Sequence, residues 1–307
     1  MSDAPILVTG GTGAQGGAVI DALLAREAPV RALVRDPASA GARGLAERGV
    51  SLVTGDFDDA ASLAAAVAGV AGVFSMQNPP RLPDRDAELR AGRKLIEAAR
   101  KAGVETFVHT SVARAGDQSR FEGWAEGLWW RDYWDSKSGV NAMVREAGFP
   151  HWVILKPAYM MDNFTAPKAH WMYPTLETRG EILTAMASDT RLDLIAAADI
   201  GLFAATAFLD PTRFHGQDID LAAEALTMGE IAQTIGQASG KPVQVRHVTA
   251  AEGERQGYSA GLMRSEQWCN VEGYKVDLAK ARGHGLALTS FAAFARRHAR
   301  AFLIGHP

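Results

Sequence analysis

The sequence predicts an α/β fold, a doubly wound parallel sheet of the Rossmann type followed by a smaller C-terminal α+β region. Three observations support this prediction. Short apolar runs alternate with helical patterns over the first half of the chain, a glycine-rich turn follows the first run, and the alternation weakens after Pro157. We therefore expect a dinucleotide-binding domain over residues 1–157 and a substrate-side region over 158–307, from which some segments can return to the first domain.

The predicted strands are short apolar runs, and the segments between them carry apolar residues at helical spacing, such as Val140, Met143 and Val144. The strands are expected at 6–8, 30–34, 50–53, 72–76, 106–111 and 152–155, and the helices at 16–26, 42–48, 60–67, 84–102 and 132–147. In such sheets ligands lie beyond the carboxyl ends of the strands, so the residues that end strands are the first candidates for a site.

Beyond Pro157 the apolar pieces are shorter, and proline-containing turns separate them. We expect helices at 199–209, 228–239 and 289–303, with short strands at 219–221 and 243–248. No internal repeat or low-complexity linker interrupts this half.

Composition limits the classes of function. The 307 residues are 47% hydrophobic and 22% charged, and the net charge of −3 gives no basic field for nucleic acid. No apolar run approaches the roughly 18 residues of a membrane span. The single cysteine, Cys269, cannot form an internal disulfide, and no secretory signal pattern precedes the first strand. These features predict a cytoplasmic protein whose ligand is a small molecule.

The glycine turn after the first strand is typical of a site that binds a dinucleotide pyrophosphate on backbone N–H groups. Gly10, Gly13 and Gly16 fit the spacing GxxGxxG, whereas Gly11, Gly13 and Gly16 fit GxGxxG, so spacing leaves the two registers open. Both place glycine where the chain turns tightly, where the backbone nears the phosphate and where the helix packs on the strand. The predicted phosphate-binding residues are Gly10, Thr12, Gly13, Ala14, Gln15 and Gly16.

The second predicted strand ends in Arg35, where an NAD-binding chain often has an acidic residue. A guanidinium suits a 2′-phosphate, so we expect NADP(H) to be preferred over NAD(H), although neighbouring Asp36 could neutralise Arg35 or bind the ribose. After the third strand, Asp56 can accept from the adenine amino group while Phe57 covers the ring. Other predicted cofactor-binding residues follow later strands: Met76, Gln77, Pro157 and Tyr159.

A candidate catalytic group lies on the helix predicted at 132–147. Tyr133 and Lys137, four residues apart, share one helical face. The Lys137 ammonium is expected to lower the pKa of the Tyr133 phenol and to hold the nicotinamide ribose, while Ser111 at a strand end positions a substrate oxygen. This arrangement suits a proton-transfer site beside a hydride carrier. Tyr133 lies in an aromatic segment, so packing in a hydrophobic wall is its alternative role.

Aromatic residues downstream suggest an apolar pocket for a flat, aromatic or quinone-like substrate, although several of them can be ordinary core. The predicted pocket residues are Trp124, Trp129, Trp130, Tyr159, Asn163 and Phe164. His109, His151 and His170 are not spaced like metal ligands, so no metal site is expected.

Several of these segments together resemble atypical short-chain dehydrogenases/reductases of the NmrA-like family. The resembling segments are 9–16, 34–37, 55–59, 135–137 and 156–164, and the Asp-Ile-Gly at 199–201 resembles the start of a family helix. The resemblance implies NADP(H) binding, a role for Lys137 near the nicotinamide ribose and a cleft between the two regions.

The family resemblance leaves two main functions open. Some members are reductases of quinones, carbonyls or activated double bonds, and others resemble dinucleotide sensors that bind regulatory proteins and often lack the tyrosine. Because Tyr133 and Ser111 are both present, we expect an NADPH-dependent reductase, with a sensor that binds a protein partner as the alternative. An epimerase or dehydratase of nucleotide sugars would use the same tyrosine and lysine, but the second half lacks an arginine cluster for a diphosphate.

Overall fold

The computed structural model describes residues 4–305, which divide into two compact units. Unit 1 comprises residues 4–116, 131–157 and 197–220, and unit 2 comprises residues 117–130, 158–196 and 221–305. The chain therefore leaves unit 1 three times and returns to it twice.

A seven-stranded sheet forms the centre of unit 1, in the order β10-β6-β5-β4-β1-β2-β3. Strands β1 to β6 pair in parallel, and β1 lies between β2 and β4, so the strand order reverses beside β1. This reversal is where doubly wound sheets bind nucleotides. The strands are β1 (Ile6–Val8), β2 (Val30–Val34), β3 (Ser51–Thr54), β4 (Gly72–Ser75), β5 (Thr106–Thr110), β6 (His151–Pro157) and β10 (Gln217–Leu221).

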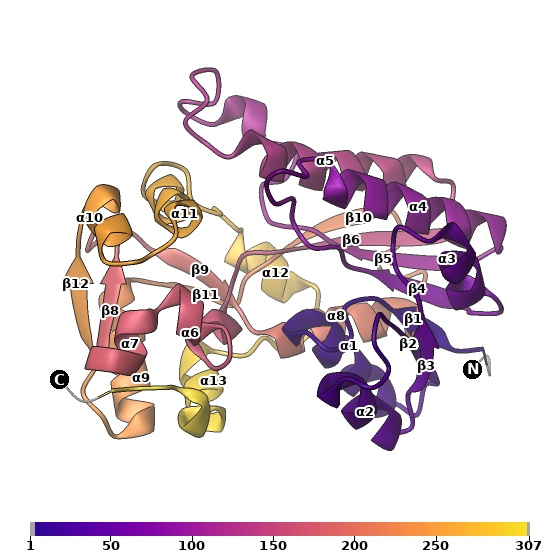
Figure 1. Ribbon diagram of the computed structural model, residues 1–307, viewed down its shortest axis with the longest axis horizontal. Helices are drawn as coiled ribbons and strands as arrows, with labels where there is room; N and C mark the ends of the chain where they lie inside the picture. Colours follow the sequence, from indigo (N-terminus) through magenta and orange to yellow (C-terminus); the bar gives the residue numbers. More distant parts are fainter. Residues whose placement is uncertain (1–3, 306–307) are drawn as a thin grey trace. The chain divides into compact units, whose positions relative to one another are not determined.

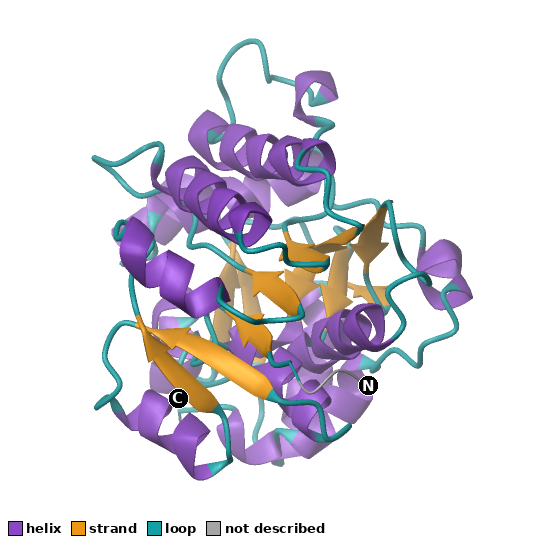
Figure 2. Cartoon of the chain, turned by 90° about the vertical axis from the view of Figure 1, so that its right-hand side faces the viewer, coloured by secondary structure: helices purple, strands orange, loops and turns teal. Residues whose placement is uncertain are grey.

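Helices cover both faces of this sheet (Figures 1 and 2). Helices α3 (Ala60–Val67), α4 (Ala87–Lys101) and α5 (Arg131–Glu146) lie on one face, and α1 (Ala14–Leu24), α2 (Ala40–Glu47) and α8 (Ala197–Leu209) lie on the other. Fully buried residues of strands and helices, including Leu7, Phe107 and Ile154, form the core between the sheet and helices α3 to α5.

Helices α1 and α8 pack unusually closely in unit 1. A Cβ at Gly201 of α8 would lie 2.3 Å from the carbonyl oxygen of Ala18 on α1, so only glycine allows this approach. Helix α8 thereby fixes α1, whose first turn follows the glycine-rich turn.

Unit 2 contains two small sheets, β11-β9-β7 and β12-β8, surrounded by short helices. Its core is aromatic: the Phe164 ring stacks on Tyr173 at 4.8 Å and meets Phe291 edge to face at 5.8 Å. The elements are η1 (Gln118–Arg120), β7 (Tyr159–Met160), η2 (Met161–Phe164), α6 (Ala169–Met172), α7 (Pro174–Arg179), β8 (Glu181–Thr184), β9 (Leu192–Ile195), β11 (Glu224–Leu226), α9 (Met228–Ser239), β12 (Gln244–His247), α10 (Ala250–Arg255), α11 (Ala260–Val271), α12 (Leu278–Gly283), α13 (Phe291–Arg297) and η3 (Ala299–Ala301).

The predicted fold class is confirmed, and the predicted strands of the first half agree with the structure to within two residues. Helix α4 begins at Ala87 rather than 84, because Arg81 and Asp84 form a bridge in a preceding turn. The helix predicted at 199–209 and the strand predicted at 219–221 are α8 and β10 of unit 1. The helix predicted at 289–303 is shorter, since α13 ends at Arg297 and a 3-10 turn follows.

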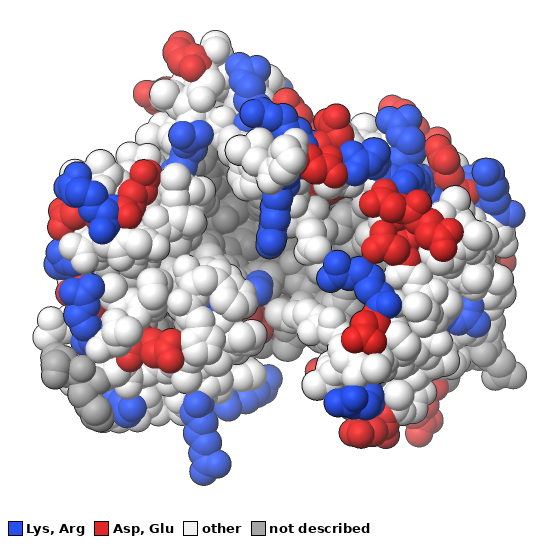
Figure 3. All heavy atoms as spheres, viewed as in Figure 1, with Lys and Arg blue, Asp and Glu red and all other residues white. Residues whose placement is uncertain are grey.

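The surface of the molecule carries both signs of charge. On the face drawn in Figure 3, acidic and basic side chains are interspersed over both units. Within residues 4–305, no helix combines the length and the apolar character that crossing a bilayer requires.

Candidate cofactor site and active site

The glycine turn between β1 and α1 has the close contacts that a dinucleotide site requires. Gly10 has a φ of +67°, and a Cβ on it would lie 2.3 Å from the Met76 side chain. A Cβ on Gly16 would lie 2.3 Å from the Gly10 carbonyl oxygen, so the helix packs directly on the turn. These two constraints favour the register Gly10, Gly13 and Gly16 over the alternative that begins at Gly11.

The first turn of α1 offers unpaired N–H groups to a ligand. Gly13 is the N-cap and provides no side-chain cap, and the first turn carries no acidic residue. The positive end of the helix dipole is therefore available to an anion. Thr12 and Gly13 are exposed, so a pyrophosphate fits this turn on both charge and access.

Side chains at the ends of β1, β4 and β5 hold the turn in place. Thr9 Oγ1 accepts from the Met76 backbone N–H at 2.8 Å and lies 2.9 Å from the Met76 carbonyl oxygen, to which it donates. Thr110 Oγ1 donates to Gln15 Oε1 at 2.7 Å. Gln15 and Met76, both predicted as cofactor-binding residues, are thus fixed to neighbouring strand ends.

A group of buried polar atoms at the ends of β4 and β5 lacks protein partners. Ser75 Oγ accepts from Gln77 Nε2 at 2.9 Å and lies 3.2 Å from His109 Nδ1. Burial, followed by the nearby Lys137 charge, lowers the pKa of His109 to about 3, so its ring is neutral. Within residues 4–305, Gln77 Oε1, His109 Nε2 and Ser111 Oγ are buried with no hydrogen-bond partner. Because such atoms are costly to leave unpaired, this edge suits a polar ligand such as the nicotinamide half of a dinucleotide.

Arg35 follows β2 directly, and its side chain is exposed. Asp36 Oδ1 accepts from the backbone N–H of Ala38 at 2.8 Å in the turn before α2. The described residues give the Arg35 guanidinium no hydrogen bond or ion pair, so all its donors remain available to a phosphate.

The turn after β3 contains the residues predicted for the adenine. Asp56 is exposed, and its Oδ1 accepts from the Asp58 backbone N–H at 2.8 Å. The Phe57 ring is partly buried and packs against the core of unit 1, so only part of it can cover a ligand. Asp59 is the N-cap of α3, and its Oδ1 accepts from the Ala61 backbone N–H at 2.9 Å.

Tyr133 and Lys137 lie on α5 as predicted, but their electrostatic relation differs from the prediction. Lys137 Nζ lies 5.7 Å from the centroid of the Tyr133 ring and 2.6 Å from Glu88 Oε1. The pKa of Tyr133 is raised rather than lowered, because the phenol is buried and the negative charge of Glu88 disfavours phenolate. The expected lowering by Lys137 was wrong, because burial of the phenol is the largest effect and the Lys137 charge is paired with Glu88, a partner that spacing does not reveal. Tyr133 is therefore a protonated phenol, able to donate.

The remaining predicted site residues lie on β6 or in unit 2. Pro157 is buried at the end of β6, and its carbonyl oxygen accepts from the Ala113 N–H at 3.0 Å. Tyr159 begins β7, where its hydroxyl lies 2.6 Å from that of Tyr173. Asn163 Oδ1 accepts from Lys168 Nζ at 3.2 Å.

The aromatic residues predicted for a substrate pocket all belong to unit 2, and they differ in exposure. Phe164 is fully buried in the aromatic core, so it supports the unit rather than facing solvent. Trp129 is buried, and its Nε1 donates to the Glu122 carbonyl oxygen at 2.6 Å. Trp124 packs edge to face on Phe121, and Trp130 is 38% exposed.

A buried carboxyl group lies among the tyrosines of unit 2. Glu266 Oε2 accepts from the Ala185 backbone N–H at 2.6 Å, whereas Oε1 is buried with no hydrogen-bond partner among the described residues. Burial raises the pKa of Glu266 to about 7. Its charge in turn contributes to raising the pKa of Tyr159 and of Tyr173, after the larger effect of burial. Sequence reasoning missed Glu266, because nothing in the local pattern marks a buried glutamate.

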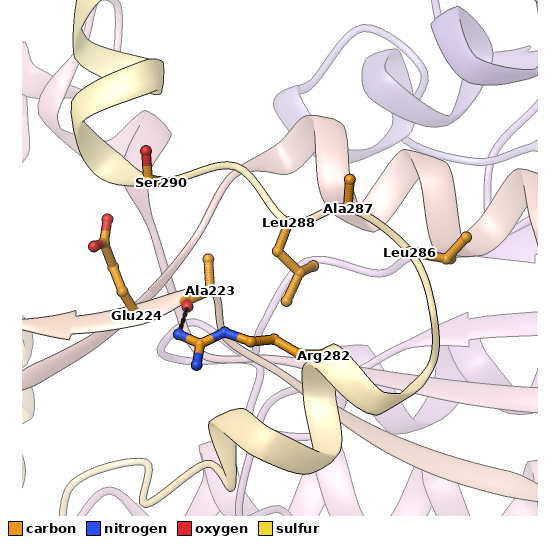
Figure 4. Close-up of a pocket in the computed structure, with 7 residues that line it drawn as sticks. All are labelled: Ala223, Glu224, Arg282, Leu286, Ala287, Leu288 and Ser290. Carbon is orange, nitrogen blue, oxygen red and sulfur yellow. Dashed lines mark hydrogen bonds between the residues drawn. The ribbon is translucent and has the colours of Figure 1, made fainter.

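Unit 2 also contains a cavity of about 350 Å³, shown in Figure 4. Arg282 donates to the Ala223 carbonyl oxygen at 3.0 Å at its edge, and Leu288 points toward the Arg282 side chain. The cavity is lined by Ala223, Glu224, Arg282, Leu286, Ala287, Leu288 and Ser290. The predicted pocket residues do not line it.

Together, the strand order, the glycine turn and the uncapped helix define a dinucleotide-binding protein of the Rossmann type. The NmrA-like family model matches residues 2–290, and the chain belongs to this family.

Three similar proteins are oxidoreductases by name. An NAD(P)H azoreductase of Xenophilus azovorans is 30% identical over 97% of this chain and 99% of its own length. Quinone oxidoreductase 2 of Escherichia coli is 28% identical over 84% of this chain and 82% of its own. The crystal structure of Citrobacter sp. triphenylmethane reductase with NADP(H) matches the fold with a TM-score of 0.75 and 22% identity, over 96% of this chain and 99% of the other.

The contact between Gly16 and Gly10 predicts that Gly16→Ala lowers NADPH affinity by at least about tenfold, because the added methyl forces the turn away from the helix. Isothermal titration calorimetry measures the effect. Gly17→Ala is the matched control, since its Cβ would lie 3.4 Å from the Gly11 carbonyl oxygen, an ordinary contact. Equal affinities of the two variants would contradict this role of Gly16.

The environment of Glu266 predicts a pH-dependent stability. Because its pKa is raised from 4.5 to about 7 in the folded state, its contribution is fully present below about pH 4.5 and is lost as pH rises through about 7. Glu266→Gln, which cannot ionise, should lack this decline. Urea unfolding of both proteins at about pH 5 and about pH 8 measures it.

The exposed Glu254 on α10 provides the control for Glu266, since Glu254→Gln should follow the wild-type dependence on pH. If the Glu266→Gln and wild-type stabilities change in parallel over this range, Glu266 does not carry a proton in the folded protein.

Proposed function

We propose that the protein is an NADPH-dependent reductase that transfers hydride to a quinone, a carbonyl or an activated alkene. The observation that carries this proposal is the buried, charge-paired Lys137 beside the protonated Tyr133, in the same unit as the glycine turn. A dinucleotide sensor needs the turn, whereas a proton donor with an ammonium beside it is needed only for a reaction.

Different residues of unit 1 bind different parts of the cofactor. The first turn of α1 holds the pyrophosphate, and Arg35 holds the 2′-phosphate. Gln77, Ser111 and the remaining N–H groups of Lys137 face the nicotinamide half. When bound there, NADPH supplies the hydride.

Tyr133 donates the proton that completes the reduction. Its raised pKa keeps the phenol protonated, so it acts as an acid in the direction of reduction. Ser111 Oγ, which has no partner within residues 4–305, orients the substrate oxygen.

The names of the relatives and the composition of unit 2 support this substrate class. The azoreductase, the quinone oxidoreductase and the triphenylmethane reductase are named for conjugated compounds. Exposed aromatic side chains such as Trp130 suit a flat, electron-poor substrate.

The proposal is tested by mixing the protein with NADPH and a panel of quinones, azo dyes, aldehydes and enones under anaerobic conditions. The absorbance of the reduced nicotinamide should fall with at least one compound. Tight NADPH binding without oxidation across the panel would reject the reductase and favour the alternative, a sensor that recruits a protein partner.

The position of Arg35 predicts that Arg35→Ala lowers NADPH affinity by about tenfold to a hundredfold, because charge-assisted bonds to the 2′-phosphate are lost. NADH affinity should stay the same, and fluorescence titration of both cofactors measures the difference. Arg48→Ala removes another exposed arginine, paired with Asp21, and should change neither affinity. An equal loss for NADPH and NADH would contradict the role of Arg35.

The proposed proton donor predicts that Tyr133→Phe lowers kcat by about a hundredfold, since the acid is removed while the ring still packs on Trp134. NADPH affinity should remain at the wild-type value, which shows that the site is intact. The measurement uses the compound of the panel that is reduced fastest. Unchanged turnover would show that Tyr133 is a packing residue.

A further inference from the structure

Glu88 is a buried charged residue to which the proposed reaction gives no role. It lies in the first turn of α4, and its side chain is 1% exposed. Glu88 Oε1 accepts from Lys137 Nζ at 2.6 Å, and Oε2 accepts from Ser136 Oγ at 2.8 Å. Apolar residues of similar size would stabilise this position as well as a buried ion pair does, so the pair points to a use for the charge.

Close packing of α4 on α5 determines where Glu88 meets Lys137. A Cβ on Gly92 would lie 2.8 Å from the Val140 side chain, and a Cβ on Gly139 would lie 2.5 Å from that of Leu89. The two helices therefore interlock within the turn that follows the ion pair on each of them. Glu88 reaches Lys137 from a fixed backbone, with both carboxylate oxygens occupied.

The ion pair leaves part of the ammonium group available. An ammonium has three N–H donors, and Glu88 accepts one of them. The described residues accept neither of the other two. A lysine on a flexible four-carbon stem would lose rotamer entropy on binding a ligand, whereas one already held by a carboxylate loses less.

We propose that Glu88 is a positioning residue that holds the Lys137 ammonium where it binds the nicotinamide ribose. The proposal rests on the role given to Lys137 under the proposed function, but it concerns binding and not turnover. Glu88 acts through Lys137 and touches neither the cofactor nor the substrate.

Two Glu88 variants separate the effect of where the Lys137 ammonium is held from the effect of the negative charge of Glu88. Glu88→Gln removes the charge, and Glu88→Asp keeps the charge but shortens the side chain by one methylene. Both should lower the affinity for NADPH by about tenfold, the value of one charge-assisted hydrogen bond. Affinity for 2′,5′-ADP, which lacks the nicotinamide mononucleotide half of NADPH, should stay at the wild-type value. Isothermal titration calorimetry measures both ligands.

Arg85→Gln is the matched control, because it removes an exposed ion pair of 2.9 Å from Arg85, two residues before α4, to Asp132 in the first turn of α5. It should change NADPH affinity by less than about twofold. If Arg85→Gln lowered NADPH affinity as much as the Glu88 variants do, the effect would come from a general disturbance of this region, and the proposal would be overturned.

A double-mutant cycle tests whether Glu88 acts through Lys137. In a Lys137→Met background, Glu88→Gln should cause no further loss of NADPH affinity. A further loss of NADPH affinity in that background would overturn the proposal. So would a wild-type NADPH affinity of Glu88→Asp, or a Glu88 variant whose affinity for 2′,5′-ADP falls in parallel with its affinity for NADPH. If NADPH binds but no compound is reduced, the proposed reductase fails while the role of Glu88 still stands.

Discussion

The contact between Gly16 and the carbonyl group of Gly10 is the constraint on which the rest of unit 1 depends. It brings the first turn of α1 against the end of β1, with no side chain between them. That turn consequently lies at the end of β1, beside the point where the strand order reverses. Gly201 allows a similar close contact on the other side of α1, where α8 touches the backbone at Ala18. Helix α1 is thus held between two contacts that only glycine permits.

Buried charges distinguish the chemistry of the two units. In unit 1 the Glu88 carboxylate is paired with Lys137, so both groups stay charged in a desolvated place. In unit 2 Glu266 has a backbone N–H for one oxygen and no partner among the described residues for the other, and it responds by a raised pKa. The pair can orient a cationic donor, whereas the single carboxyl can only gain or lose a proton. The Glu88 carboxylate thus stays charged, whereas the charge of Glu266 depends on pH.

Local pattern was sufficient to predict most of unit 1. Strands β1 to β6 contain apolar runs, whereas β10 reads Gln-Asp-Ile-Asp-Leu, and the glycine spacing marks the start of α1. Local pattern does not predict the ion pair of Glu88, because its partners Ser136 and Lys137 lie 48 and 49 residues away on another helix. Burial of the Tyr133 phenol, followed by the charge of Glu88, raises the pKa that the spacing of Tyr133 and Lys137 predicts to be lowered. In unit 2, strands of two to four residues such as β7 and β8 are too short to show a period.

The order in which the chain completes unit 1 has a consequence for its biosynthesis. Helix α8 and strand β10 come from residues 197–220, after the chain has already built part of unit 2. Until they emerge from the ribosome, β6 is an open sheet edge and α1 lacks the helix that packs on it. The nucleotide-binding half is therefore not an autonomous N-terminal domain during translation. Unit 1 is complete only after about seven tenths of the chain, at residue 220 of 307, and a fragment ending at Pro157 would expose apolar surface and be prone to aggregate.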